Sequence, residues 1–135
     1  MTRHSRRFIP MVLAIAVFAL TASAAMAQNL TGHWPATVTT SERSNGTYCV
    51  ALTDDGSFGR PHSGPAKLIP NNSPYEGYFT VINGLITVTI PYTSGPGDCC
   101  DYFVFTAQVS NGKGVFNYFG VEDNGIVAFG KKNSC

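Results

Sequence analysis

The stretch that decides the fold is FTVINGLITVTI, residues 79–90, which reads as two β-strands joined at Asn83–Gly84. Both residues of an Asn-Gly pair tolerate positive φ angles, as the type I′ turn of a two-residue hairpin requires. Such a turn sets the register, so that Ile82 lies opposite Leu85 and the following pairs alternate between the two faces. The predicted buried face consists of Phe79, Val81, Ile86, Val88 and Ile90, and the threonines face water.

Three further Asn-Gly pairs predict turns elsewhere in the chain. We expect two-residue turns at Asn111–Gly112 and at Asn124–Gly125. At Asn45–Gly46 we expect a three-residue loop, because that loop places Leu52 opposite Val38 and keeps the apolar side chains on one face. The aromatic side chains expected to face inward are Tyr48, Phe79, Phe103, Phe105, Phe116, Tyr118 and Phe129.

Short apolar segments alternate with turn residues along the rest of the sequence, and no segment has a helical period. Strands are expected near 32–40, 47–53, 65–69, 77–82, 85–91, 101–109, 114–121 and 126–131. Closely spaced strands joined by hairpins are typical of an antiparallel meander, and closing such a sheet removes its exposed edges. We therefore predict an all-β fold, in which about eight short strands close into a small barrel supported by disulfides.

The first 27 residues have the pattern of a secretory signal peptide. Basic residues precede an apolar run over 11–20, and Ala25–Ala27 then supplies the small residues that signal peptidase needs. The apolar run is shorter than the roughly 20 residues that span a bilayer, so we expect no membrane span. We expect cleavage after residue 27, which leaves residues 28–135 as one barrel domain that is secreted or periplasmic.

The charge balance argues against a nucleic-acid partner. Nine Lys and Arg against eight Asp and Glu give the whole chain a formal net charge of +1. Three of the basic residues lie within 1–27, so residues 28–135 carry six against eight, a net charge of −2. Phosphate binding needs clustered Lys and Arg, and the sequence has no such cluster.

The four cysteines, Cys49, Cys99, Cys100 and Cys135, all follow the expected cleavage site. An even number in an oxidising compartment indicates disulfides, and four cysteines allow three pairings. Because adjacent cysteines rarely bond to each other, we predict that Cys49 and Cys135 each bond to one member of the Cys99–Cys100 pair. A metal site is the alternative, but neither Cys-x-x-Cys nor paired histidines accompany the cysteines, so we expect no metal and no cofactor.

A short motif opens the first expected strand. The stretch LTGHW, Leu30-Thr31-Gly32-His33-Trp34, resembles the Gly-x-Trp start of the calycin group, the lipocalins and avidins. The resemblance implies a barrel that holds a small ligand, with Gly32 and Trp34 closing its floor. Trp34 is the single tryptophan of the chain, so the several tryptophans that line the biotin site of avidins are missing, and biotin binding is not implied.

The long segment over residues 54–76 is rich in Gly, Pro, Asn and Ser. Long connections often form lids or binding loops, although some are only tolerated insertions. The polar candidates for a binding role in this segment are Arg60, His62, Lys67 and Tyr75.

An apolar patch is expected on the outer face of the barrel. The two-residue turns predicted above place Val104 opposite Phe119, and Tyr102 opposite Val121, on the side away from the core. Contiguous apolar patches on soluble proteins often mark an interface, although a loop could cover this one. Tyr102, Val104, Phe119 and Val121 are therefore the interface candidates.

Catalytic signatures are missing from the sequence, which has no Gly-x-Ser-x-Gly elbow, no His-Glu-x-x-His and no phosphate-binding glycine loop. We expect a non-catalytic binding protein that takes a small apolar ligand among the inward aromatic side chains. The alternative is an interaction or inhibitor module that uses the outer patch or the 54–76 loop, and a secreted enzyme is the third reading. An eight-strand barrel can either fill with side chains or hold one ligand, and the chain can be a monomer or a homodimer.

Overall fold

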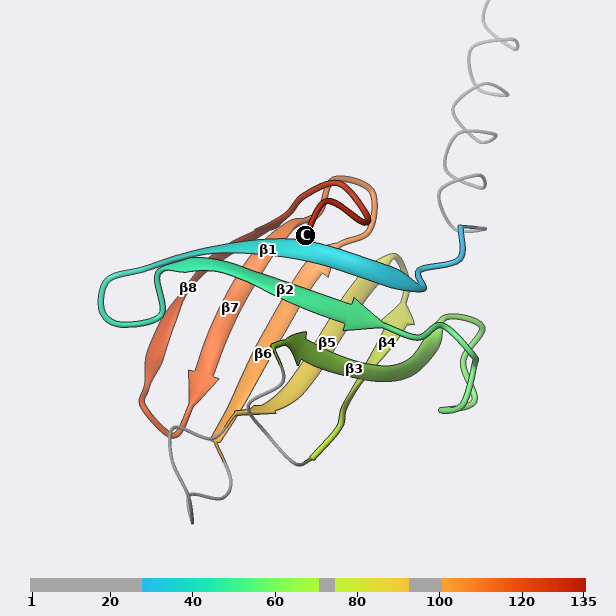
Figure 1. Ribbon diagram of the computed structural model, residues 1–135, viewed down its shortest axis with the longest axis horizontal. Helices are drawn as coiled ribbons and strands as arrows, with labels where there is room; N and C mark the ends of the chain where they lie inside the picture. The colour runs from blue at the N-terminus through green and yellow to red at the C-terminus, as the bar shows by residue number, and fades with distance from the viewer. Residues whose placement is uncertain (1–27, 71–74, 93–100) are drawn as a thin grey trace, which may run out of the picture.

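The computed structural model describes residues 28–70, 75–92 and 101–135, and these form one closed antiparallel barrel (Figure 1). Each strand pairs with the next along the chain, and β8 returns to pair with β1. The strands are β1 Gly32–Thr40, β2 Gly46–Leu52, β3 Ser63–Ile69, β4 Gly77–Ile82, β5 Leu85–Tyr92, β6 Asp101–Gln108, β7 Lys113–Phe119 and β8 Asp123–Phe129. The predicted all-β meander and its closure into a barrel are confirmed.

Aromatic side chains fill the middle of the barrel. Phe79, Phe105 and Phe116 are fully buried, and Phe103 is nearly so. The ring centroids of Phe103 and Phe116 lie 5.2 Å apart in an edge-to-face arrangement, and those of Phe105 and Phe116 are equally close. Such contacts add to the free energy gained by burying the rings, so this part of the interior is a packed core.

The β4–β5 hairpin has the predicted geometry. Asn83 and Gly84 have φ angles of 50° and 77°, as a type I′ turn requires, and Ile82 lies opposite Leu85. The residues predicted for the inner face, Phe79, Val81, Ile86, Val88 and Ile90, are all buried.

The β6–β7 register differs from the prediction by two residues. Tyr102 lies opposite Phe119 and Val104 lies opposite Asn117, so the predicted Val104–Phe119 and Tyr102–Val121 pairs are wrong. The connection is a loop over 109–112, in which the Asn111 side-chain oxygen accepts a hydrogen bond from the Lys113 backbone N–H (2.9 Å). Because the shift is even, every side chain keeps its predicted face.

The β7–β8 turn lies earlier in the chain than predicted. The predicted turn at Asn124–Gly125 is wrong, because both residues lie inside β8 and the connection is 120–122. Gly120 and Glu122 supply the positive φ angles, 109° and 57°. A Cβ atom at position 125 would collide with the backbone carbonyl of Thr39 in β1, so this glycine permits close strand approach.

The β1–β2 connection is longer than the predicted three-residue loop. Leu52 lies opposite Gly32, and Val38 lies opposite Gly46, so the predicted Leu52–Val38 pairing is wrong. The connection spans residues 41–45 and is held by Asp123 of β8, as described below. A carboxylate from a distant strand therefore sets this loop.

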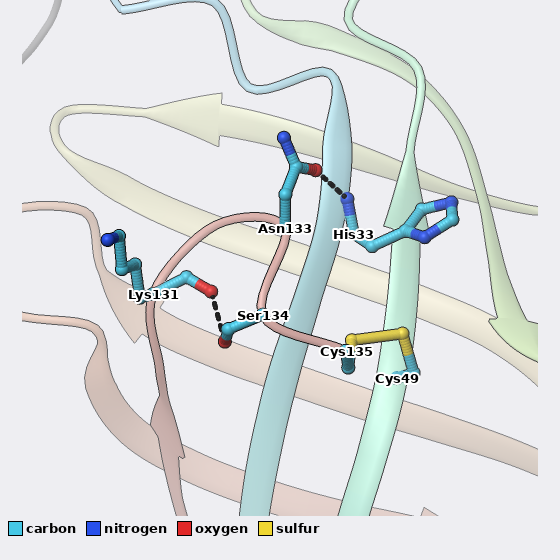
Figure 2. Close-up of a disulfide and its surroundings, with 6 residues drawn as sticks. All are labelled: His33, Cys49, Lys131, Asn133, Ser134 and Cys135. Atoms are coloured by element: carbon cyan, nitrogen blue, oxygen red, sulfur yellow. Dashed lines mark hydrogen bonds between the residues drawn. A yellow bond between two sulfur atoms is a disulfide. The ribbon is translucent and has the colours of Figure 1, made fainter.

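The disulfide joins Cys49 to Cys135, so the prediction that each bonds to the Cys99–Cys100 pair is wrong (Figure 2). After β8 the chain runs back along β1, where the Asn133 backbone N–H donates to the His33 carbonyl (2.5 Å). This return brings Cys135 to the middle of β2. The Cys99–Cys100 pair lies outside the described residues.

Candidate functional site

A pocket of about 130 Å³ opens at the end of the barrel where β1 begins and β2 and β8 end. Its lining residues come from the strap segment before β1 and from strands and connections far apart in sequence: Gln28, Leu30, Trp34, Leu52, Ile86, Val109 and Phe129. All of these except Gln28 are apolar, and Leu30, Leu52 and Ile86 are buried. The site can therefore hold an apolar group, with one amide available at its rim.

The strap, residues 28–31, forms one wall of this pocket and is held by hydrogen bonds. The indole N–H of Trp34 donates to the Leu30 carbonyl (2.9 Å), and the Leu30 backbone N–H donates to Asp54 Oδ2 (2.9 Å). The backbone N–H of Asp54 in turn donates to the Thr31 hydroxyl (2.8 Å). Both backbone polar groups of Leu30 are thus satisfied while its side chain lies buried over the pocket.

Asp54 and His62 form a hydrogen-bonded contact beside the strap. His62 Nδ1 lies 2.7 Å from Asp54 Oδ2, and the Asp54 side chain is only 3% exposed. Asp54 Oδ1 is buried without a hydrogen-bond partner among the described residues. The neighbouring Ser63 hydroxyl donates to the Arg60 carbonyl (3.0 Å). These contacts couple the β2–β3 loop to the strap.

The predicted ligand-binding aromatic residues separate into three groups. Phe129 lines the pocket, whereas Phe79, Phe103, Phe105 and Phe116 lie in the packed core. Tyr48 and Tyr118 lie toward the opposite end of the barrel and are described next.

Polar and aromatic groups close the opposite end of the barrel. The Tyr48 hydroxyl donates to the Ser44 carbonyl (2.9 Å), and the Tyr118 hydroxyl donates to Asp101 Oδ2 (3.2 Å). Burial, followed by the charges of Tyr92 and Asp123, raises the pKa of Tyr48 above its ordinary value. These contacts hold Tyr48 as a neutral hydrogen-bond donor that stabilises the β1–β2 connection.

The candidates in the 54–76 segment do not converge on one site. Arg60 and His62 lie in the β2–β3 connection, whereas Lys67 lies on the outer face of β3 and Tyr75 precedes β4. Strand β3, which the sequence predicts near 65–69, divides this segment into two connections. His62 is the member of this set whose described contact, with Asp54, reaches the strap beside the pocket.

Most pocket residues were not among the predicted site residues. The alternation of side chains along the strands predicts that Leu52 and Ile86 face the interior of the barrel. The resemblance of the Gly-x-Trp stretch to the calycin group implies that Trp34 lies at one end of the barrel. No local signal marks Asp54, whose contacts with the strap depend on the closed barrel.

The interface candidates occupy two different environments. Tyr102 and Phe119 are adjacent and exposed on the outer face, with Val104 beside them and opposite Asn117. Val121 lies in the β7–β8 turn, where it packs against the core. The outer patch therefore lacks Val121, and within it Phe119 lies opposite Tyr102 rather than Val104.

Within residues 28–70, 75–92 and 101–135, no group of three or more His, Cys, Asp and Glu side chains is placed to hold a metal ion. The same part of the chain contains no helix that is long and apolar enough to cross a membrane. No family model, curated protein or solved structure matches the chain.

Proposed function

We propose that this protein binds a small apolar ligand, without catalysis, in the pocket at the strap end of the barrel. The observation that carries the proposal is the pocket itself, which is apolar on nearly all sides and lies where the barrel core stops. Binding sites for small molecules are commonly apolar hollows with a few polar groups, and the mouths of β-barrels are frequent locations.

The pocket volume limits the size of the ligand. About 130 Å³ is close to the size of an engineered apolar cavity of about 150 Å³ that binds benzene. A single aromatic ring or a short branched alkyl group would fit this space, with any polar substituent directed toward Gln28 at the rim. Larger ligands would have to extend beyond the pocket into solvent.

Two further observations support the proposal. The closed eight-strand meander is compatible with the calycin-like fold that the LTGHW stretch suggests, a group whose barrels hold small ligands. The Cys49–Cys135 disulfide agrees with export to an oxidising compartment, where we infer that the protein acts as a secreted or periplasmic binding protein.

The test uses Trp34, the single tryptophan, as a reporter inside the pocket. The protein is produced from the full chain in an oxidising compartment and titrated with bromobenzene, whose heavy atom quenches indole fluorescence on contact. We expect saturable quenching with half-saturation at roughly 0.1–1 mM. Quenching that rises linearly without saturation would contradict the proposal, because it reports random collisions only.

Two neighbouring residues provide a matched pair of variants. Ile86 points into the pocket, whereas Leu85 points outward from the same hairpin and is exposed. Ile86→Phe fills the space and should weaken bromobenzene binding at least about tenfold. Leu85→Phe should leave binding unchanged. Equal binding by both variants would mean that the probe binds elsewhere.

A further inference from the structure

Gln28 occupies two significant positions at once. It is the first residue after the cleavage site expected at residue 27, and it is the polar member of the pocket lining. The other lining residues are apolar side chains from the strap, the strands and their connections. A charge on the first residue of the exported chain would therefore lie at the rim of an apolar pocket, where it would affect which ligands bind.

The strap is fixed from its second residue onward. Lys132 Nζ donates to the Asn29 carbonyl (2.9 Å), and the Asn29 side-chain oxygen accepts a hydrogen bond from the Thr31 backbone N–H (2.7 Å). Leu30 is buried over the pocket, with both backbone polar groups bonded as described above. Gln28 itself is exposed, so its side chain and the amine that cleavage creates are accessible while the rest of the strap stays in place.

A glutamine at the start of a chain can react with its own terminus. The unprotonated α-amine attacks the side-chain Cδ, the new C–N bond closes a five-membered lactam, and the bond between Cδ and Nε2 breaks. Nε2 takes up the proton that the amine gives up and leaves as ammonia, so the step needs no oxidant, reductant or second reactant. The attack is intramolecular, and an α-amino group with an ordinary pKa of about 7.7–8.0 is partly unprotonated near neutral pH.

We propose that the exported protein begins at Gln28 and that this residue is converted to pyroglutamate, which leaves the pocket rim without the positive charge of a free terminus. The inference rests on the export and the pocket proposed above, and it adds the charge class of the ligand. A free amine at the rim would attract a carboxylate or phosphate substituent, whereas the lactam offers one N–H donor and one carbonyl acceptor. The pocket therefore favours a neutral ligand, whose polar substituent is an uncharged group such as a hydroxyl or an amide.

The first experiment is intact mass spectrometry of the protein exported from the full chain. The purified protein is held warm in phosphate buffer until its mass no longer changes, and it is measured after reduction of its disulfides. We expect it to be lighter than residues 28–135 by one ammonia. Tandem mass spectrometry of the tryptic peptide that ends at Arg43 then places the loss at Gln28.

Gln28→Asn is the matched control for this measurement. The variant keeps an amide at the same position, but its shorter side chain would have to close a strained four-membered ring, so it should keep its full mass. A wild-type protein that retains the mass of a free amine, or that begins at another residue, would overturn the proposal. An equal loss of ammonia from the variant would overturn it as well, because the loss would then arise elsewhere.

The second experiment measures the charge preference of the rim by quenching of Trp34 fluorescence. Bromobenzene and 4-bromobenzoate are titrated into the wild type and into Gln28→Asn at about pH 6, where a free α-amine is mostly protonated. Relative to bromobenzene, 4-bromobenzoate should bind about two- to fivefold better to the variant than to the wild type. Lys132 carries the same charge in both proteins, so it does not produce this difference.

The two experiments separate the modification from the pocket. An equal preference in both proteins would overturn the role assigned to the rim charge. Quenching by both probes that never saturates would overturn the proposed pocket and the ligand class with it. The mass measurement decides the modification of Gln28 in either case, because it does not depend on ligand binding.

Discussion

Asp123 shows how a single buried acid can organise one end of the barrel. The residue is 1% exposed, and Oδ2 accepts hydrogen bonds from the Ser44 N–H (2.8 Å), the Arg43 N–H (3.1 Å) and the Thr40 hydroxyl (3.0 Å). Burial alone would raise the pKa of Asp123, but these hydrogen bonds outweigh burial and hold the pKa below its ordinary value. The β1–β2 connection therefore depends on an ionised carboxylate.

Acid should weaken this contribution. Because the folded-state pKa of Asp123 is below its unfolded value of about 3.9, the stabilisation is fully present above that pH and is lost as pH falls through the folded pKa. Asp123→Asn should lower the melting temperature at pH 7 and flatten its further decrease in acid. Thermal unfolding followed by circular dichroism from pH 7 to about pH 2 measures both effects. Glu42 is an exposed acid in the same connection, and Glu42→Gln should change neither the melting temperature at pH 7 nor its decrease in acid.

At the scale of elements, two Asn-Gly pairs that look alike in sequence have different structural roles. Asn83–Gly84 forms the β4–β5 turn, where Gly84 has a φ of 77° and a Cβ atom would meet open space. Gly125 lies within β8, with an ordinary strand φ, where a Cβ atom would meet the Thr39 backbone of β1. One glycine is required for backbone conformation, the other for close strand approach.

The different roles of Gly84 and Gly125 predict different losses of unfolding free energy when each is replaced by alanine. Gly84→Ala should cost about 1 kcal/mol, because alanine tolerates the left-handed region with modest strain. Gly125→Ala should cost about 2–3 kcal/mol, because β1 and β8 must move apart at the seam that closes the barrel. Urea unfolding of the two variants measures both values. Equal losses would show that the β8 backbone adapts to the added methyl group.

At the scale of the whole molecule, the Cys49–Cys135 disulfide ties the C-terminal tail across β1 to β2 (Figure 2). The bonded residues are 86 apart in sequence, so the cross-link closes most of the barrel into one covalent ring. Figure 1 shows that the tail held by this disulfide lies against the strands that close the barrel. The covalent link and the β1–β8 pairing therefore support the same seam.

Removing the cross-link should destabilise the protein strongly. On the chain-entropy model a ring of this length contributes about 4–5 kcal/mol. Cys49→Ala combined with Cys135→Ala should lower the unfolding free energy by up to that amount, as measured by urea unfolding. Peptide mapping under non-reducing conditions checks the Cys49–Cys135 pairing first. A double variant as stable as the wild type would show that hydrogen bonds alone hold the tail.

What the sequence by itself determined was local: the β4–β5 hairpin, and the face on which each strand residue lies. Asn83–Gly84 needs no help from distant residues, because positive φ at both positions suffices for its turn. The predicted face of each strand residue is correct although three predicted strand registers are wrong. Each register differs from the prediction by an even number of residues, and side chains alternate between the two faces with a period of two. The buried aromatic set and the barrel class followed from that alternation.

Only the tertiary structure decided the other registers, the disulfide and the pocket, because each depends on groups that are far apart in sequence. Asp123 sets the β1–β2 connection from β8, and Thr39 of β1 explains why position 125 is glycine. Cys135 reaches Cys49 because the tail doubles back along β1, which no local pattern indicates. The pocket is made from the segment before β1 and from strands that are far apart in sequence, so it forms only when the barrel closes.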